Sequence, residues 1–444
     1  MNRSLTWTLL LSLAAAPRIC GAAAEVQQQK GTKWVSVSAA LVTDFANLRN
    51  APAANLDKYG GLADQTVKAT GFFRTEKIDS RWWFIDPDGH PFISAGICSA
   101  NLTQSARHTV PAGYADEQAW ADATSKLLRD NGFNTLGCWS DWKSFQGDSR
   151  MPYTAQSDFV SAFAKKLGIS HEEVGHTGFP NDCMPIFNPD FESFCDDHAR
   201  ELAATADDPW LLGHFSDNEL PLFPTSLHNF LSLPDDDPGH QAAQHWLDAR
   251  YHTPAGQNHR IYTPGDQDAF LQFAATRYYT VVAAAIHKYD PNHLYLGSRL
   301  YGKSIAPSIF KASTAVDVVS VNYYKAWSAD QTQMSLWSRL SGRPILISEW
   351  YAMKLDSPAK QVEGAGFRVS SEAGRGMFYQ NYAISLLRNP SCVGWHWFKY
   401  GGDSPGREIG VVDSDYQPHS ELLQLMQQLN ARIYPLANYF LPKR

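Results

Sequence analysis

Two glutamates each close an apolar run, at positions where a carboxylate could do chemistry. Glu219 follows the run 210–218, and Glu349 follows the run 344–348. Cleavage of a glycosidic bond needs one acid that protonates the leaving oxygen and a second carboxylate that attacks the anomeric carbon or activates water. Two close carboxylates also raise the pKa of one of them, as an acid working near neutral pH requires. Either glutamate alone could be a surface ion-pair residue, but the two together favour catalysis.

The elements that must position this pair are the strands of a parallel sheet. Short apolar runs alternate with helical stretches, which predicts an α/β fold, a single (β/α)8 TIM barrel. Catalytic groups of such barrels project from the carboxyl ends of the strands. Glu219 would end the fourth strand and Glu349 the seventh, so the two would face one another across the mouth. We expect strands at Phe92–Ser99, Thr135–Trp139, Met151–Ala155, Leu211–Asn218, Leu294–Arg299, Val316–Tyr323, Pro344–Trp350 and Val393–Tyr400, and helices at Glu117–Asn131, Pro189–Thr205, Ala269–Tyr289, Arg375–Arg388 and His419–Ile433.

Three further segments frame the predicted barrel. Residues 25–70 lack strong periodicity and are expected to wrap the domain as a lead-in, which leaves 71–444 as the catalytic domain. The pair Asp88-Gly89 between two apolar runs predicts an N-terminal β-hairpin. A long excursion after strand 4, over 221–268, is rich in Pro, Asp and Gly and is expected to shape the substrate groove.

The first 24 residues have the pattern of a signal peptide. Arg3 precedes an apolar run over 6–16, and small residues lead to Ala24, where we expect cleavage. The run is too short to span a membrane, and no later stretch is long enough. The pattern predicts a secreted or periplasmic protein. Cys20 leaves a lipoprotein as the alternative.

The composition excludes several classes of protein. A hydrophobic fraction of 44% with 19% charged residues is typical of a globular core, and a net charge of -7 argues against a nucleic-acid partner, which needs a clustered basic excess. The cysteines have no metal-type spacing, so no metal or cofactor is expected. A single bridge between Cys183 and Cys195 is possible in an oxidising compartment.

Two motifs are set aside on chemical grounds. Ser404 lies in a G-x-S-x-G pattern, followed by Asp413 and His419 in the order of a serine hydrolase. The residue after this serine is Pro405, which lacks the backbone N–H that the oxyanion hole requires. The histidines of the segment 171–176 suggest a zinc-binding helix, but they are five positions apart instead of four, so a helix would point them about 140° apart.

The two glutamates also carry a family resemblance. Asn218-Glu219 at the fourth strand and Glu349 at the seventh resemble the pattern of clan A glycoside hydrolases, a (β/α)8 group that retains configuration. The segments 215–220, 376–381 and 393–400 are most similar to the β-agarase families. The resemblance spans roughly residue 82 to the C-terminus.

Carried over by residue, the resemblance implies roles for the polar groups at the mouth. Glu219 would be the acid/base, Glu349 the nucleophile, and Asn218 a donor to the sugar 2-hydroxyl. A tyrosine at the end of the sixth strand often hydrogen-bonds the nucleophile in this clan, and strand register favours Tyr323 over Tyr324.

The resemblance also points to aromatic and loop residues. Trp397 matches the aromatic side chain on which the sugar stacks, with Trp395 two residues back on the same face; the alternative is a core position for both. Trp139, Asp141 and Asn101 follow the second and first strands and could either line the cleft or cap loops. An arginine that some clan members carry near the second strand is not evident.

These observations predict a retaining glycoside hydrolase that cleaves a β-linked polysaccharide or oligosaccharide by double displacement. A galactan such as agarose is the expected substrate. The alternatives are a β-glucanase or β-galactosidase of the same clan, or a non-catalytic carbohydrate-binding barrel. The presence of both Glu219 and Glu349 speaks against a pure binding protein.

Overall fold

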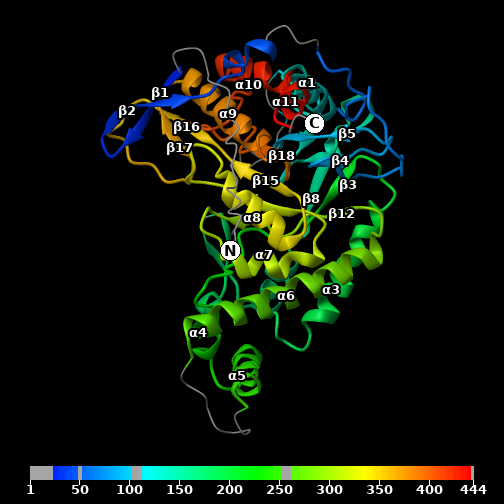
Figure 1. Ribbon diagram of the computed structural model, residues 1–444, viewed down its shortest axis with the longest axis vertical. Helices are drawn as coiled ribbons and strands as arrows, with labels where there is room; N and C mark the ends of the chain where they lie inside the picture. The colour runs from blue at the N-terminus through cyan, green and yellow to red at the C-terminus, as the bar shows by residue number, and fades with distance from the viewer. Residues whose placement is uncertain are drawn as a thin grey trace, which may run out of the picture.

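The computed structural model describes residues 24–48, 53–102, 110, 113–173, 175–252 and 262–441, so all of the predicted signal peptide except Ala24 lies outside the described residues. Its centre is a curled, nine-stranded sheet in which all neighbouring strands are parallel (Figure 1). The order of strands across the sheet is β12-β11-β8-β7-β6-β18-β15-β14-β13. The strands are β6 (Ser94–Ile97), β7 (Thr135–Leu136), β8 (Tyr153–Gln156), β11 (Leu211–Phe215), β12 (Leu294–Tyr295), β13 (Leu300–Tyr301), β14 (Val319–Asn322), β15 (Ile345–Trp350) and β18 (Cys392–Trp397).

The eight predicted strands all correspond to strands of this sheet, which are shorter than predicted; β8 ends one residue later and β18 begins one residue earlier than expected. The two edge strands, β12 and β13, are joined by the short segment 296–299. Because β12 pairs with β11 and β13 pairs with β14, this one segment reaches both edges. The arrangement is compatible with a TIM-like barrel.

Helices follow most of the strands, as in other folds with parallel sheets. Local signals explain where they begin: Thr263 and Asp266 form a capping box with a proline at the first helical position, and Ser371 caps its helix by accepting from the Gly374 N–H. The helices are α1 (Glu117–Asp130), α2 (Phe159–Leu167), α3 (Phe191–Ala199), α6 (Pro264–Tyr289), α7 (Pro307–Ala312), α8 (Gln331–Ser341), α9 (Glu372–Leu387), α10 (Ser420–Asn430) and α11 (Ile433–Tyr439). None of the described helices combines the length and the apolar content that a membrane span needs.

The predicted hairpin belongs to a small antiparallel sheet beside the main one. This sheet contains β3 (Arg74–Ile78), β4 (Arg81–Ile85) and β5 (Pro91–Phe92), and Phe84 pairs with Phe92 across the Asp-Gly turn. Phe84 and Phe92 are fully buried in one cluster with Leu212, Leu346 and Val393 of the parallel strands. The hairpin therefore fills one end of the space that the curled sheet encloses.

The lead-in has more structure than its sequence indicates. β1 (Ala24–Lys30) and β2 (Lys33–Ala39) form an antiparallel hairpin. This hairpin joins a five-stranded sheet with β16 (Ala352–Leu355), β17 (Phe367–Val369) and β19 (Arg407–Glu408). β16 begins two residues after β15 ends, so this sheet lies close to the carboxyl end of the seventh strand.

The predicted excursion is largely helical in its described part. It contains α4 (Ser226–Leu231), α5 (Pro238–Tyr251) and the first turns of α6, which begins five residues before the predicted start. Figure 1 shows α4 and α5 at the amino-terminal end of α6, projecting from the rest of the molecule. The expectation that the excursion shapes a groove stays a prediction.

Candidate active site

Glu349 lies at the carboxyl end of β15, held by a cation and a hydroxyl. Its Oε2 accepts a hydrogen bond of 2.5 Å from Arg299 Nη2, and its Oε1 accepts one of 2.5 Å from the Tyr324 hydroxyl. The glutamate is 7% exposed and Arg299 is fully buried. Both carboxylate oxygens of Glu349 are therefore held by partners from other segments of the chain.

Glu219 follows β11 and lies in a different environment. Its Oε1 accepts a 2.7 Å hydrogen bond from Asn322 Nδ2, and no cation is bonded to it among the described residues. Burial, and after it the negative charge of Glu349, raise the pKa of Glu219 to about 7. A carboxyl group with this pKa is protonated over much of the neutral range, as a general acid must be.

Asn322, at the end of β14, hydrogen-bonds side chains that follow β11 and a side chain in β15. Its amide nitrogen donates to Glu219 and also to Asn218 Oδ1 at 3.2 Å, while its Oδ1 accepts from Ser348 Oγ at 2.8 Å. Asn218 in turn donates from Nδ2 to the Gly175 carbonyl oxygen at 2.8 Å. The structure therefore brings the predicted Asn218 and Glu219 together, and Asn322 is a residue of the site that the sequence did not reveal.

The prediction that Tyr323 hydrogen-bonds Glu349 is wrong, because Tyr324 makes that contact. The extra residue where the register of β14 and β15 shifts lies in β15, so the alternation along β14 is uninterrupted. Side chains alternate along a strand, so Asn322 and Tyr324 point to the mouth while Tyr323 points the other way. The Tyr323 hydroxyl donates to Gln333 Oε1 in α8 at 3.1 Å, and its ring packs against Trp337.

The predicted stacking role of Trp397 and Trp395 is also wrong. Both are fully buried and pack towards α9: Trp395 Nε1 donates to the Tyr379 hydroxyl at 2.9 Å, and the rings of Trp397 and Tyr379 are 5.7 Å apart. The two tryptophans share a face as expected, but a register shift near the start of β18 turns that face to the helix layer. Phe398, the next residue, packs against Trp139.

Of the three predicted loop residues after the first two strands, Trp139 lies at the mouth of the sheet, and Asn101 and Asp141 hydrogen-bond to the backbone of the loops. Trp139 is 37% exposed, and the centroid of its ring lies 4.2 Å from the Arg299 guanidinium carbon. Trp139 therefore lies beside the Arg299–Glu349 pair. Asn101 Nδ2 donates to the Trp139 carbonyl oxygen at 2.9 Å. Asp141 Oδ2 accepts from the Leu102 N–H at 3.1 Å. Asn101 and Asp141 thus stabilise the loops that carry Trp139.

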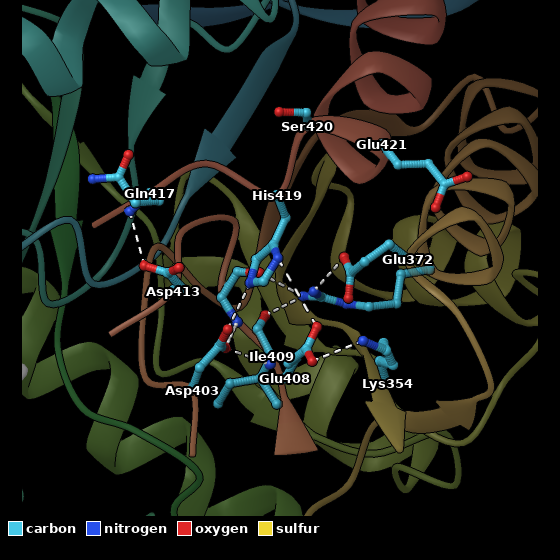
Figure 2. Close-up of polar contacts among 12 residues, drawn as sticks. Lys354, Glu372, Asp403, Glu408, Ile409, Asp413, Gln417, His419, Ser420 and Glu421 are labelled. Atoms are coloured by element: carbon cyan, nitrogen blue, oxygen red, sulfur yellow. Dashed lines mark hydrogen bonds and ion pairs between the residues drawn. The ribbon is translucent and has the colours of Figure 1, made fainter. Parts of the chain in front are cut away.

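The set-aside motifs have structural roles. His419 bonds to Asp403 at 2.6 Å, whereas Asp413 accepts from the backbone of Gln417, so no serine-hydrolase triad forms (Figure 2). His171 and His176 lie on the antiparallel strands β9 (His171–Glu173) and β10 (His176–Gly178) instead of on a helix. The suggested Cys183–Cys195 bridge is not formed; the five cysteines in the described part of the chain are free and buried.

Two groups of possible metal ligands lie away from the glutamate pair. In one, Glu372, Glu408 and His419 offer ligand atoms within 4.8 Å of one another, but Arg375 and Lys354 already pair with the two glutamates. Figure 2 shows the pairing of Lys354 in β16 with Glu408 in β19, and Glu372 of α9 beside them. The other group, His214, Asp290 and His293, is fully buried and joined by hydrogen bonds of 2.7 to 2.9 Å. The carboxylates of both groups already have partners within the protein.

Known proteins similar to this chain include two agarases. No family model matches the chain. The chain is 25% identical to β-agarase B and 24% identical to β-agarase A, both of Vibrio sp. (strain JT0107), over 85% and 86% of its own length. The crystal structure of BpGH50 superposes with a TM-score of 0.79 at 25% identity and covers 94% of this chain and 96% of that one. The chain is thus similar to β-agarases over most of its own length and shares the fold of the BpGH50 structure.

The extent of the likeness differs between relatives. This agarase-like chain spans about half the length of the two curated agarases, 50% of β-agarase B and 48% of β-agarase A. The structure of an exo-β-agarase has the same fold, with a TM-score of 0.70 at 22% identity, and the match covers 89% of this chain and 69% of that one.

Proposed function

We propose that the protein is a retaining glycosidase that cleaves a β-linked galactan of the agarose type, with Glu349 as nucleophile and Glu219 as acid/base. The observation that carries this proposal is the difference between the two carboxyl groups. Glu349 accepts hydrogen bonds from the Arg299 guanidinium and the Tyr324 hydroxyl, whereas Glu219 has no such partners among the described residues and its pKa is raised to about 7. A nucleophile needs groups that hold its carboxylate in place, and a general acid needs a proton near neutral pH.

In the first half of the reaction, Glu349 attacks the anomeric carbon. The bond from that carbon to the leaving sugar oxygen breaks, and Glu219 gives its proton to that oxygen. The product of this step is a glycosyl ester on Glu349 and an ionised Glu219. Asn322 donates to Glu219 Oε1 and stabilises the charge that forms there.

In the second half, Glu219 acts as the base. It takes a proton from water, the water oxygen attacks the anomeric carbon, and Glu349 leaves as a carboxylate. Because the ester has removed the charge of Glu349, one cause of the raised pKa of Glu219 is absent in the intermediate. The lower pKa suits Glu219 to act as a base. When Glu349 leaves and regains its charge, the pKa of Glu219 rises again, and the acid form is restored at the end of the cycle.

The proposal includes the scaffold, a closed (β/α)8 barrel. It is supported by backbone hydrogen bonds from the segment 294–297 to the strands on either side: Ser216 N donates to Gly297 O, and Asp317 N donates to Tyr295 O, each at 2.9 Å.

The proposal also includes the place where the protein acts, outside the cytoplasm after removal of residues 1–24. The apolar run 6–16 and the size of a polysaccharide substrate support this localisation.

The substrate is tested with a panel of polysaccharides. Agarose, a β-1,4-galactan and a β-1,3-glucan are incubated with the parent protein and with Glu349→Ala, and reducing ends are measured. We expect product from agarose with the parent and none with the variant. Product from the glucan alone would move the proposal to another substrate. Binding without product from either protein would support a carbohydrate-binding barrel.

A further inference from the structure

Arg299 ends the predicted fifth strand and lies in a buried position that is unusual for an arginine. The segment 294–298 is apolar or small, and Arg299 follows it as a fully buried charge. Buried charges are costly unless they are paired. The guanidinium satisfies this need with Glu349 Oε2 through Nη2 and with Cys138 Sγ, at 3.1 Å, through Nη1.

The backbone of Arg299 contacts the other carboxylate residue. Its carbonyl oxygen accepts from the Glu219 N–H at 3.3 Å. Arg299 and Glu219 have φ angles of 52° each, in the left-handed region that side-chain-bearing residues rarely adopt. Such conformations persist where the surroundings fix them, and they are common at active sites. One residue therefore bonds Glu349 through its side chain and Glu219 through its main chain.

Aromatic rings separate the guanidinium from solvent. The guanidinium carbon lies 4.2 Å from the Trp139 ring centroid and 5.5 Å from that of Phe215. Of these two residues, Trp139 is partly exposed and Phe215 is fully buried. With water excluded, the attraction between Arg299 and Glu349 is stronger than it would be on the surface.

We propose that Arg299 is the positioning residue for both carboxylates: its guanidinium pairs with the carboxylate of the nucleophile Glu349 and fixes its position, and its carbonyl sets the place of Glu219. This inference rests on the proposed function. Arg299 acts through the two glutamates.

The test compares Arg299→Met and Arg299→Lys with the same substitutions at a matched arginine. Arg81 is 1% exposed and its guanidinium donates to the carbonyl oxygens of Leu387 and Cys392, so it is equally buried but has no carboxylate partner among the described residues. Rates on agaro-oligosaccharides are measured across pH, together with the thermal midpoint of unfolding. The titration of the Glu349 carboxyl is followed by 13C NMR, with Glu349→Gln for assignment.

For Arg299→Met we expect kcat/KM to fall about 10²- to 10³-fold, as on removal of one preorganised electrostatic contact. The acid limb of the pH–rate profile and the NMR titration of Glu349 should both move to higher pH, because a carboxylate without its cation binds a proton more readily. Arg299→Lys, which keeps the charge, should move both less. The Arg81 variants should lower the thermal midpoint and leave the acid limb in place.

Two results would overturn the inference. One is an Arg299→Met protein that is destabilised like Arg81→Met but has an unshifted acid limb and an unshifted titration. The other is an equal shift in the Arg81 variants. If the parent hydrolyses none of the polysaccharides, the proposed function fails on its own, and the NMR titration of Glu349 still decides whether Arg299 controls its ionisation.

Discussion

The carboxyl ends of β15 and β11 present the same type of side chain in two different settings. At β15, Glu349 is bonded to a guanidinium and a phenol. At β11, Glu219 is bonded to the amide of Asn322, and its pKa rises to about 7 through burial and the charge of Glu349. The difference teaches that the two roles are set by neighbours on other strands, since the residue type and the strand-end position are the same.

The largest expected effect comes from removing each carboxylate in turn. Glu349→Ala should lower kcat at least about 10⁴-fold, because the covalent route is lost. Glu219→Ala should lower it about 10²- to 10⁴-fold, the usual contribution of a general acid. Added azide should restore turnover of Glu219→Ala with formation of a β-glycosyl azide, detected by NMR. If azide instead gives the β-product with Glu349→Ala, the two roles are exchanged.

The hydroxyl of Tyr324 offers a smaller and more selective change. Tyr324→Phe removes one hydrogen bond to a charged group, worth about 1.5–3 kcal/mol, so kcat should fall about 10- to 100-fold. Tyr323→Phe is the matched control, because its hydroxyl bonds Gln333 on the far side of the strand. Steady-state rates of both variants, measured at the same pH, show which of the two hydroxyls supports the reaction. Equal losses would mean that the two tyrosines act only through folding.

Trp139 and Trp397 test which tryptophan faces the substrate. Trp139→Ala should raise KM about tenfold, as expected for the loss of one stacking surface, with little change in stability. Trp397→Ala empties a fully buried site and should cost about 3–5 kcal/mol of unfolding free energy. Oligosaccharide kinetics and urea unfolding separate the two. A raised KM in a stably folded Trp397→Ala protein would restore the original prediction.

The smallest effect is a shift in pH dependence at Asn322. The general acid must be protonated, so activity should fall as pH rises through about 7, the pKa of Glu219. The Asn322 hydrogen bond lowers this pKa, because it stabilises the charged form. Asn322→Ala should therefore move the basic limb to higher pH, with a loss of less than about tenfold at the optimum. Ser348→Ala, which removes a partner of Asn322 only, should give a weaker shift of the same sign.

The strand ends were predictable from the sequence because an apolar run that turns polar marks both the buried strand and its mouth. This rule located Asn218, Glu219 and Glu349. Which of two adjacent tyrosines faces the mouth was not predictable, since β14 is buried on both faces and its residue types do not show which face points inward. The same limit applies to Trp395 and Trp397: alternation placed them on one face, but the sheet's curvature and a register shift in β18 decide which face that is.

Long-range partners were also beyond the sequence. Arg299 bonds a glutamate fifty positions away, and nothing in the segment 294–299 names that partner. The lead-in strands β1 and β2 have no clear alternation of burial, because the hairpin is partly exposed on both faces and is held by pairing with β17. Pairing between distant segments leaves no local pattern to detect.

The most direct test of the account is the identity of the residue that becomes glycosylated. A 2-deoxy-2-fluoro-β-galactosyl donor with a good leaving group should form a stable ester, and peptide mass spectrometry locates it. We predict a label on Glu349 in the parent protein and none in Glu349→Ala. A label on Glu219, or turnover of the donor with inversion of configuration and no label, would contradict the assignment of the two carboxylates.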